Sequence, residues 1–74
     1  MKISNELYQS LLQRYETEIQ ECKSTLLIYF EKSIGIADHS NILDEMDELI
    51  NRMSSANDKL KMLKKTFGNE YSKL

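Results

Sequence analysis

Two apolar stripes of helical period, separated by one glycine-containing break, constrain this chain more than any other feature of its sequence. In each stripe the apolar residues recur at steps of three and four, with two steps of seven in the second stripe, and such steps place them on one face of a helix. The first stripe consists of Tyr8, Leu12, Tyr15, Ile19, Cys22, Leu26 and Tyr29. The second consists of Met46, Ile50, Met53, Leu60 and Phe67. Each predicted helix therefore has one face that needs a partner surface.

The break between the stripes predicts an all-α, antiparallel two-helix hairpin of the coiled-coil-like kind. We expect one domain over residues 1–74, with helices at about 4–33 and 41–67, a turn at 34–40 and a short tail at 68–74. Gly35 and Gly68 are the expected stops, because a helix C-terminus often needs a residue at positive φ. An alternative is that the second helix continues past Gly68, since Tyr71 and Leu74 stay in phase with it.

Folding the chain back at the turn pairs residues whose numbers add to about 75. This register sets Tyr29 beside Met46, Leu26 beside Leu49, Cys22 beside Met53, Ile19 beside Ala56, Tyr15 beside Leu60, Leu12 beside Leu63 and Tyr8 beside Phe67. Two independent stripes that match along their whole length favour a hairpin over two unrelated helices. Asn57 either faces this seam, where it would fix the register, or lies at a solvated edge with Ala56 in the core position.

The hairpin does not use all of the apolar surface. The run from Leu26 to Phe30 is apolar around the whole helix, and such a helix is usually buried all round. We therefore expect a homodimer that forms a four-helix bundle. The residues expected on the self-association or partner surface are Leu7, Leu11, Leu27, Phe30, Ile34 and Met62.

Composition excludes several classes of protein. The chain has a single cysteine, which rules out an internal disulfide. One cysteine and one histidine together cannot complete the usual zinc ligand set, so we expect neither a metal nor a cofactor. The N-terminal residues lack the apolar core of a signal peptide, and no segment reaches the roughly 20 apolar residues of a membrane span. The expected location is the cytoplasm, or the host cytoplasm if the protein is viral.

Charge argues against a dedicated nucleic-acid binder. The net charge is −2, whereas such proteins are usually strongly basic. A candidate basic contact patch on the second helix consists of Lys59, Lys61, Lys64 and Lys65. These lysines spread around the helix, so a solvated surface explains them better than a groove-facing row does. Weak nucleic-acid binding through this patch stays as an alternative function.

No group of residues predicts catalysis. The acidic residues between Asp44 and Glu48 suit a helix N-terminus, since the helix dipole favours negative charge there. His39 has no Ser, Cys or second His placed to form a nucleophile pair with it, and a turn or capping role fits it better. Cys22 lies in the middle of an apolar stripe, where core filling fits better than reactivity. We expect no enzyme and no catalytic residue.

Two resemblances to known families enter at the turn. The segment from Tyr29 to Ile42 contains Gly35-Ile36, an acid at Asp38 and then His39, and it resembles the turn of small orphan helical-hairpin proteins encoded by tailed bacteriophages. That resemblance implies a viral origin and no particular chemistry. A second resemblance, carried by Ser40, Leu43 and Asp44, is to the Ser-x-x-Leu-Asp motif of sporulation aspartyl-phosphate phosphatases. It implies, as an alternative function, a phospho-aspartyl phosphatase-like regulator acting through Ser40 and Asp44.

The sequence therefore predicts a non-enzymatic protein–protein interaction module. It would act as an oligomer, with a dimer favoured, and would dock on a protein partner through the apolar residues that the hairpin leaves exposed. A small phage-type accessory or host-modulating protein is the expected setting.

Overall fold

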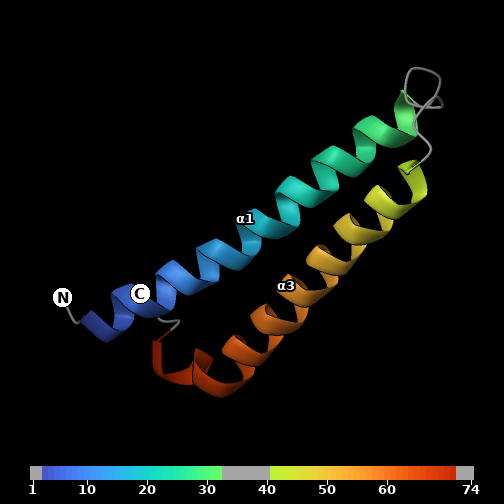
Figure 1. Cartoon of the computed structure of the whole chain (residues 1–74). Coiled ribbons are helices and arrows are strands. Elements are labelled where there is room, and N and C mark those ends of the chain that lie inside the picture. Colours follow the sequence, from blue (N-terminus) through green and yellow to red (C-terminus); the bar gives the residue numbers. More distant parts are fainter. Residues whose placement is uncertain (1–2, 33–40, 72–74) are drawn as a thin grey trace.

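Two long helices packed against each other make up the fold. The computed structural model describes residues 3–32 and 41–71, and within them helix α1 spans Ile3–Glu31 and helix α3 spans Ile42–Tyr71. The helices run antiparallel side by side as a hairpin (Figure 1). The molecule is a rod of 51 × 18 × 15 Å. The predicted two-helix hairpin is confirmed, and no strand occurs in the described parts of the chain.

The helix starts follow local capping chemistry. The amide of Glu45 donates to the carbonyl of Asn41 at 2.9 Å, so Asn41 is the residue whose carbonyl accepts the first bond of α3. Asp44 and Glu45 lie in the first turn, where the helix dipole favours acids. Helix α1 begins at Ile3, one residue before the expected start, and ends at Glu31. The predicted turn at 34–40 lies outside the described residues.

Helix α3 does not stop at Gly68, as the sequence had favoured, but continues to Tyr71. Gly68 does not adopt a positive φ. The physical reason is burial: the Tyr71 ring packs on the Tyr8 ring, with centroids 5.8 Å apart, and the extra turn of helix brings it there. The aromatic contact therefore favours the alternative in which the second helix continues.

The core lies along the seam between the helices. Cys22, Leu26 and Leu49 form its buried centre, and Tyr29, Met46 and Met53 pack against them. These six residues are the members of three predicted cross-helix pairs, and they pack together in one cluster, as the predicted register requires. The buried side chains among residues 3–32 and 41–71 are Tyr8, Cys22, Leu26, Leu49 and Ala56. A core this small is consistent with a fold of only two helices.

One residue of the second stripe, Ile50, lies off the seam. Ile50 is 47% exposed, whereas its neighbour Leu49 is 8% exposed and occupies the seam. One residue turns a helix by about 100°, so only one of the two can face α1. Seven residues later the same rule decides whether Ala56 or Asn57 occupies the core position. Ala56 is buried and Asn57 is exposed. Phe67 is 45% exposed near the end of α3, and it lines one hollow together with Tyr8, its predicted partner.

Candidate interaction surfaces

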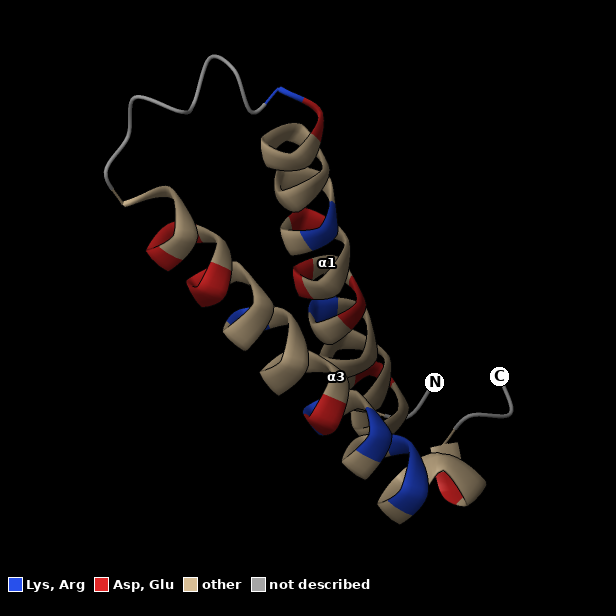
Figure 2. Cartoon of the chain, turned by 90° about the vertical axis from the view of Figure 1, so that its right-hand side faces the viewer, with Lys and Arg blue, Asp and Glu red and all other residues tan. Residues whose placement is uncertain are grey.

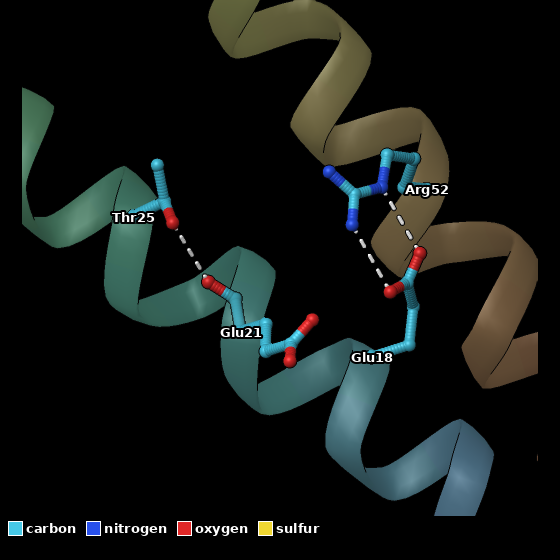
Figure 3. A network of polar contacts seen from close by, with 4 residues as sticks. All are labelled: Glu18, Glu21, Thr25 and Arg52. Carbon is cyan, nitrogen blue, oxygen red and sulfur yellow. Dashed lines mark hydrogen bonds and ion pairs between the residues drawn. The ribbon is translucent and has the colours of Figure 1, made fainter.

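One side of the seam is marked by an ion pair. The guanidinium of Arg52 donates from Nε and Nη2 to the two carboxylate oxygens of Glu18, both at 3.0 Å (Figure 3). This bidentate geometry lowers the pKa of Glu18, first through the hydrogen bond from Arg52 and then through the guanidinium charge, while desolvation acts in the opposite direction. The same contact raises the pKa of Arg52. We call this the salt-bridge side of the hairpin.

A polar groove lies on the salt-bridge side. It has a volume of about 790 Å³, and it is lined by residues of both helices that include Arg14, Glu18, Arg52 and Lys59. Lys59 also lies over the Tyr15 ring, with its Nζ 6.0 Å from the centroid. The lining mixes both signs of charge with hydroxyls such as Ser55, so the groove has the character of a solvated surface rather than an enclosed ligand site.

A second cross-helix contact lies near the end where α1 finishes and α3 begins, which we call the connected end. The Tyr29 hydroxyl donates to Glu45 Oε2 at 3.3 Å. Desolvation raises the pKa of Tyr29, and the neighbouring Glu45 charge and the hydrogen bond raise it further. The numbers of Tyr29 and Glu45 add to 74, so this contact agrees with the predicted register, in which paired residue numbers add to about 75.

An apolar hollow lies at the opposite, open end of the hairpin. It has a volume of about 230 Å³ and is lined by Ser4, Leu7, Tyr8, Leu11, Leu63, Phe67 and Tyr71. Met62 is 62% exposed and lines an adjoining hollow that shares Leu63 and Phe67 with the first. We call the two hollows together the open-end groove. Of the predicted interaction surface, Leu7 and Leu11 thus line one hollow, and Met62 lines the one beside it.

The other predicted surface residues lie near the connected end. Phe30 is 68% exposed and Leu27 is 49% exposed. On α3, Leu43 and Ile50 are 77% and 47% exposed and lie seven residues apart, which places them on one face of the helix. We call Leu27, Phe30, Leu43 and Ile50 the connected-end patch. Ile34, also predicted for the surface, is outside the described residues.

The connected-end patch faces away from the salt-bridge side. Ile50 is two residues from Arg52, a rotation of about 200°, so the two side chains leave α3 on opposite sides of the seam. On α1, Thr25 lines a hollow together with Arg52, and Phe30 follows five residues later, about 140° further round. The seam residues Leu26 and Tyr29 lie between these two directions. The predicted interaction surface is therefore divided into two, at opposite ends and on different sides.

Charge is sorted along α3. Acidic residues occupy its first part, near the connected end, and lysines predominate in its later part, which also contains Asp58 and Glu70 (Figure 2). All four lysines of the candidate basic contact patch, Lys59, Lys61, Lys64 and Lys65, are exposed. They leave the helix in different directions, since the steps of two, three and one residues between them turn it by about 200°, 300° and 100°. They do not form a single row.

The residues of the other predicted chemistries lie apart. Asp44 is exposed in the first turn of α3, whereas Ser40 and His39 are outside the described residues. Cys22 is buried and forms no disulfide. Across residues 3–32 and 41–71, no three His, Cys, Asp or Glu side chains are grouped so that they could hold a metal ion. Neither described helix contains a stretch apolar enough to cross a membrane.

Comparison of the chain with protein-family models, with curated proteins and with solved structures gives no match. Its function has to be argued from its own surface.

Sequence reasoning missed two members of the connected-end patch. The apolar stripe predicts Ile50 in the seam, and the sequence gives Leu43 a role only in the phosphatase-like motif. A signal was present: Leu49 and Ala56 continue a seven-residue spacing that places Ile50 and Leu43 one step beyond the seam. The small side chain of Ala56 weakened that signal, because it adds little to an apolar stripe.

Proposed function

We propose that this chain is a non-enzymatic protein–protein interaction module that acts as a homodimer, forming a four-helix bundle, and docks on another protein. Two exposed apolar surfaces carry the proposal: the connected-end patch and the open-end groove. Contiguous apolar surface that remains exposed on a small protein usually marks a contact with another molecule. With one surface at each end and on different sides, self-association need not cover the site for a second protein.

The accessible area supports self-association. A compact monomer of 8.7 kDa exposes about 4,700 Å², whereas this hairpin exposes 5983 Å². The excess of about 1,200 Å² is larger than the roughly 800 Å² that each partner buries in a standard interface. A two-helix rod thus has enough uncovered surface for a stable contact.

The setting we propose is a small phage-type accessory or host-modulating protein in the host cytoplasm. The resemblance of the segment from Tyr29 to Ile42 supports this origin. A host protein or a viral machine would then be the partner, taken into the open-end groove through an apolar helix face or loop.

Light scattering tests the self-association. The wild-type chain is expected at twice its monomer mass, and the double variant Leu27→Asp/Phe30→Asp at the monomer mass. Ile28→Asp is the matched control, because Ile28 is 56% exposed and lies between the two on the same helix, but points to the other side. A wild-type chain that stays monomeric at high concentration would refute the proposed dimer.

Affinity capture with wild-type protein and with Leu7→Asp tests the docking site. A partner that binds through the open-end groove is retained by wild type and lost from the variant, while the mass of the variant stays dimeric. Equal retention by both proteins would move the docking site away from the groove.

A further inference from the structure

We infer that the connected-end patch is the surface that receives a second copy of this chain, and that the two hairpins lie side by side with their connected ends together. In this arrangement α1 of each copy lies on α3 of the other. The inference rests on the proposed self-association and adds the face and the orientation, which the proposed function leaves open.

The area of the connected-end patch fits a dimer contact. A fully exposed large apolar side chain presents about 200 Å², so the exposed fractions of Leu27, Phe30, Leu43 and Ile50 together leave roughly 500 Å² per chain uncovered. A standard interface buries about 800 Å² per partner, of which somewhat more than half is non-polar. The patch supplies the non-polar part of such an interface, and the flanking polar residues supply the remainder.

The seam residues next to the patch are also incomplete within one chain. Met46 and Met53 pack against the core cluster, yet both remain only partly buried. Met46 is four residues before Ile50 and Met53 is three residues after it, so both lie next to Ile50 on the surface of α3, on the side away from Arg52. A second hairpin laid on the patch would cover their exposed parts, and the flexible methionine side chain adapts readily to such a contact.

Charge complementarity selects the orientation. When the connected ends lie together, α1 of one copy runs beside α3 of the other at the same levels as within the hairpin. Lys23 is exposed and lies seven residues before Phe30, on the same face of α1. In this orientation it lies near Asp47 of the partner subunit. Their numbers add to 70, as do those of Glu18 and Arg52, which bond at 3.0 Å across the seam. The pair between Lys23 and Asp47 occurs twice, because the dimer has two-fold symmetry.

The reverse orientation loses this complementarity. If the two hairpins overlap through the same patch but point in opposite directions, α3 lies on α3. Asp47, midway between Leu43 and Ile50, then meets Asp47 of the partner subunit near the two-fold axis. Two like charges in a partly desolvated contact repel each other. If the reversed hairpins overlap along their full length, the patch instead lies on polar residues such as Gln9 and Lys64.

Sedimentation equilibrium on the full chain tests the face. Leu43→Asp is expected to raise the dimer dissociation constant at least 100-fold, and the control Ile28→Asp to change it by less than about threefold. Circular dichroism on each variant checks that the helices are intact. A dimer that persists in Leu43→Asp would refute the face and leave the proposed self-association standing.

Charge exchange tests the orientation. Lys23→Glu and Asp47→Lys are each expected to weaken the dimer about tenfold, and the double variant to regain most of the loss, because it restores the pair with its signs reversed. Asp47→Asn provides the opposite readout. It weakens a dimer in which Asp47 pairs with Lys23, and it strengthens one in which Asp47 meets its own copy, so a tighter dimer would overturn the orientation.

Distance measurement on a folded dimer gives a readout that does not depend on stability. A spin label at Glu6→Cys, in a Cys22→Ala background, marks the open end of each hairpin. With connected ends together the two labels lie within roughly 30 Å, whereas the reversed overlap through the patch separates them by roughly 60 Å, given 1.5 Å per residue. A long distance in a dimer would refute the orientation alone. A chain without any dimer would refute the proposed self-association and, with it, this inference.

Discussion

Replacing Gly68 with alanine changes stability in a direction that the structure fixes. Gly68 lies inside α3 without a positive φ, and a Cβ built on it would be 3.7 Å from the Tyr8 hydroxyl oxygen and 4.0 Å from Lys64 Cβ. Both distances are ordinary van der Waals contacts, so alanine fits without displacement. Glycine in a helix costs about 0.5–1 kcal/mol relative to alanine, and Gly68→Ala should therefore stabilise the fold by that amount.

Thermal unfolding followed by circular dichroism measures this effect. For a chain of this length, about 1 kcal/mol corresponds to a rise in Tm of roughly 4–8 °C, so an increase of about 2–8 °C is expected. The control is Ser54→Gly, which introduces the same backbone freedom at an exposed position of α3 and should lower Tm. Wild type and variants are compared at one protein concentration, because association also shifts Tm. A lower Tm for Gly68→Ala would mean that Gly68 ends the helix in a left-handed conformation, and it would refute the continuous α3.

Three further perturbations have expected outcomes. Leu26→Ala, at a position only 6% exposed in the core cluster, should cost about 2–5 kcal/mol in urea unfolding, and a loss below about 1 kcal/mol would remove Leu26 from the core. Arg52→Met should return the pKa of Glu18 toward its usual value in an NMR titration; because the folded pKa is lowered, the pair stabilises the fold above the ordinary pKa of Glu18 and loses this effect as pH falls through the folded value. Glu45→Gln should lower the pKa of Tyr29 in an ultraviolet titration, since the carboxylate charge is one cause of its rise, and an unchanged pKa would leave burial as its cause.

The sequence predicts the hairpin well because each helix has its own apolar stripe, which is a pattern of residues close together in the sequence. The first stripe holds all three buried residues of α1, and Gly and Pro are absent from that helix, so its face and extent follow directly. The second helix was harder, because Leu49 and Ile50 are adjacent and equally apolar. The stripe places Ile50 in the seam, whereas the register pairs Leu49 with Leu26, and the rotation of α3 against α1 in the structure decides for Leu49. Likewise, the continuation past Gly68 depends on a ring contact between Tyr8 and Tyr71, which are far apart in the sequence.

The division of the interaction surface was beyond the sequence for a similar reason. Leu7 and Phe30 were predicted as members of one surface because both lie off the first stripe. Whether two such residues share a side depends on where each lies relative to the partner helix. The ion pair between Glu18 and Arg52 supplies that reference, since it fixes one side of the seam, and the connected-end patch then lies on the other.

If the connected-end patch is covered by a second copy, the stability of the fold depends on protein concentration. Few side chains are buried within one described hairpin, so much of the apolar contact would come from the dimer. A hundredfold increase in concentration changes the free energy of a two-chain equilibrium by about 2.7 kcal/mol. With about 0.7 kcal/mol of unfolding enthalpy per residue in two chains of 74, Tm should rise by roughly 10 °C over that range. Phe30→Asp, as a monomer, should show a lower Tm that does not change with concentration. A wild-type Tm that is constant over the same range would mean that one hairpin alone accounts for the measured stability, and the apolar surfaces would then be sites for other proteins only.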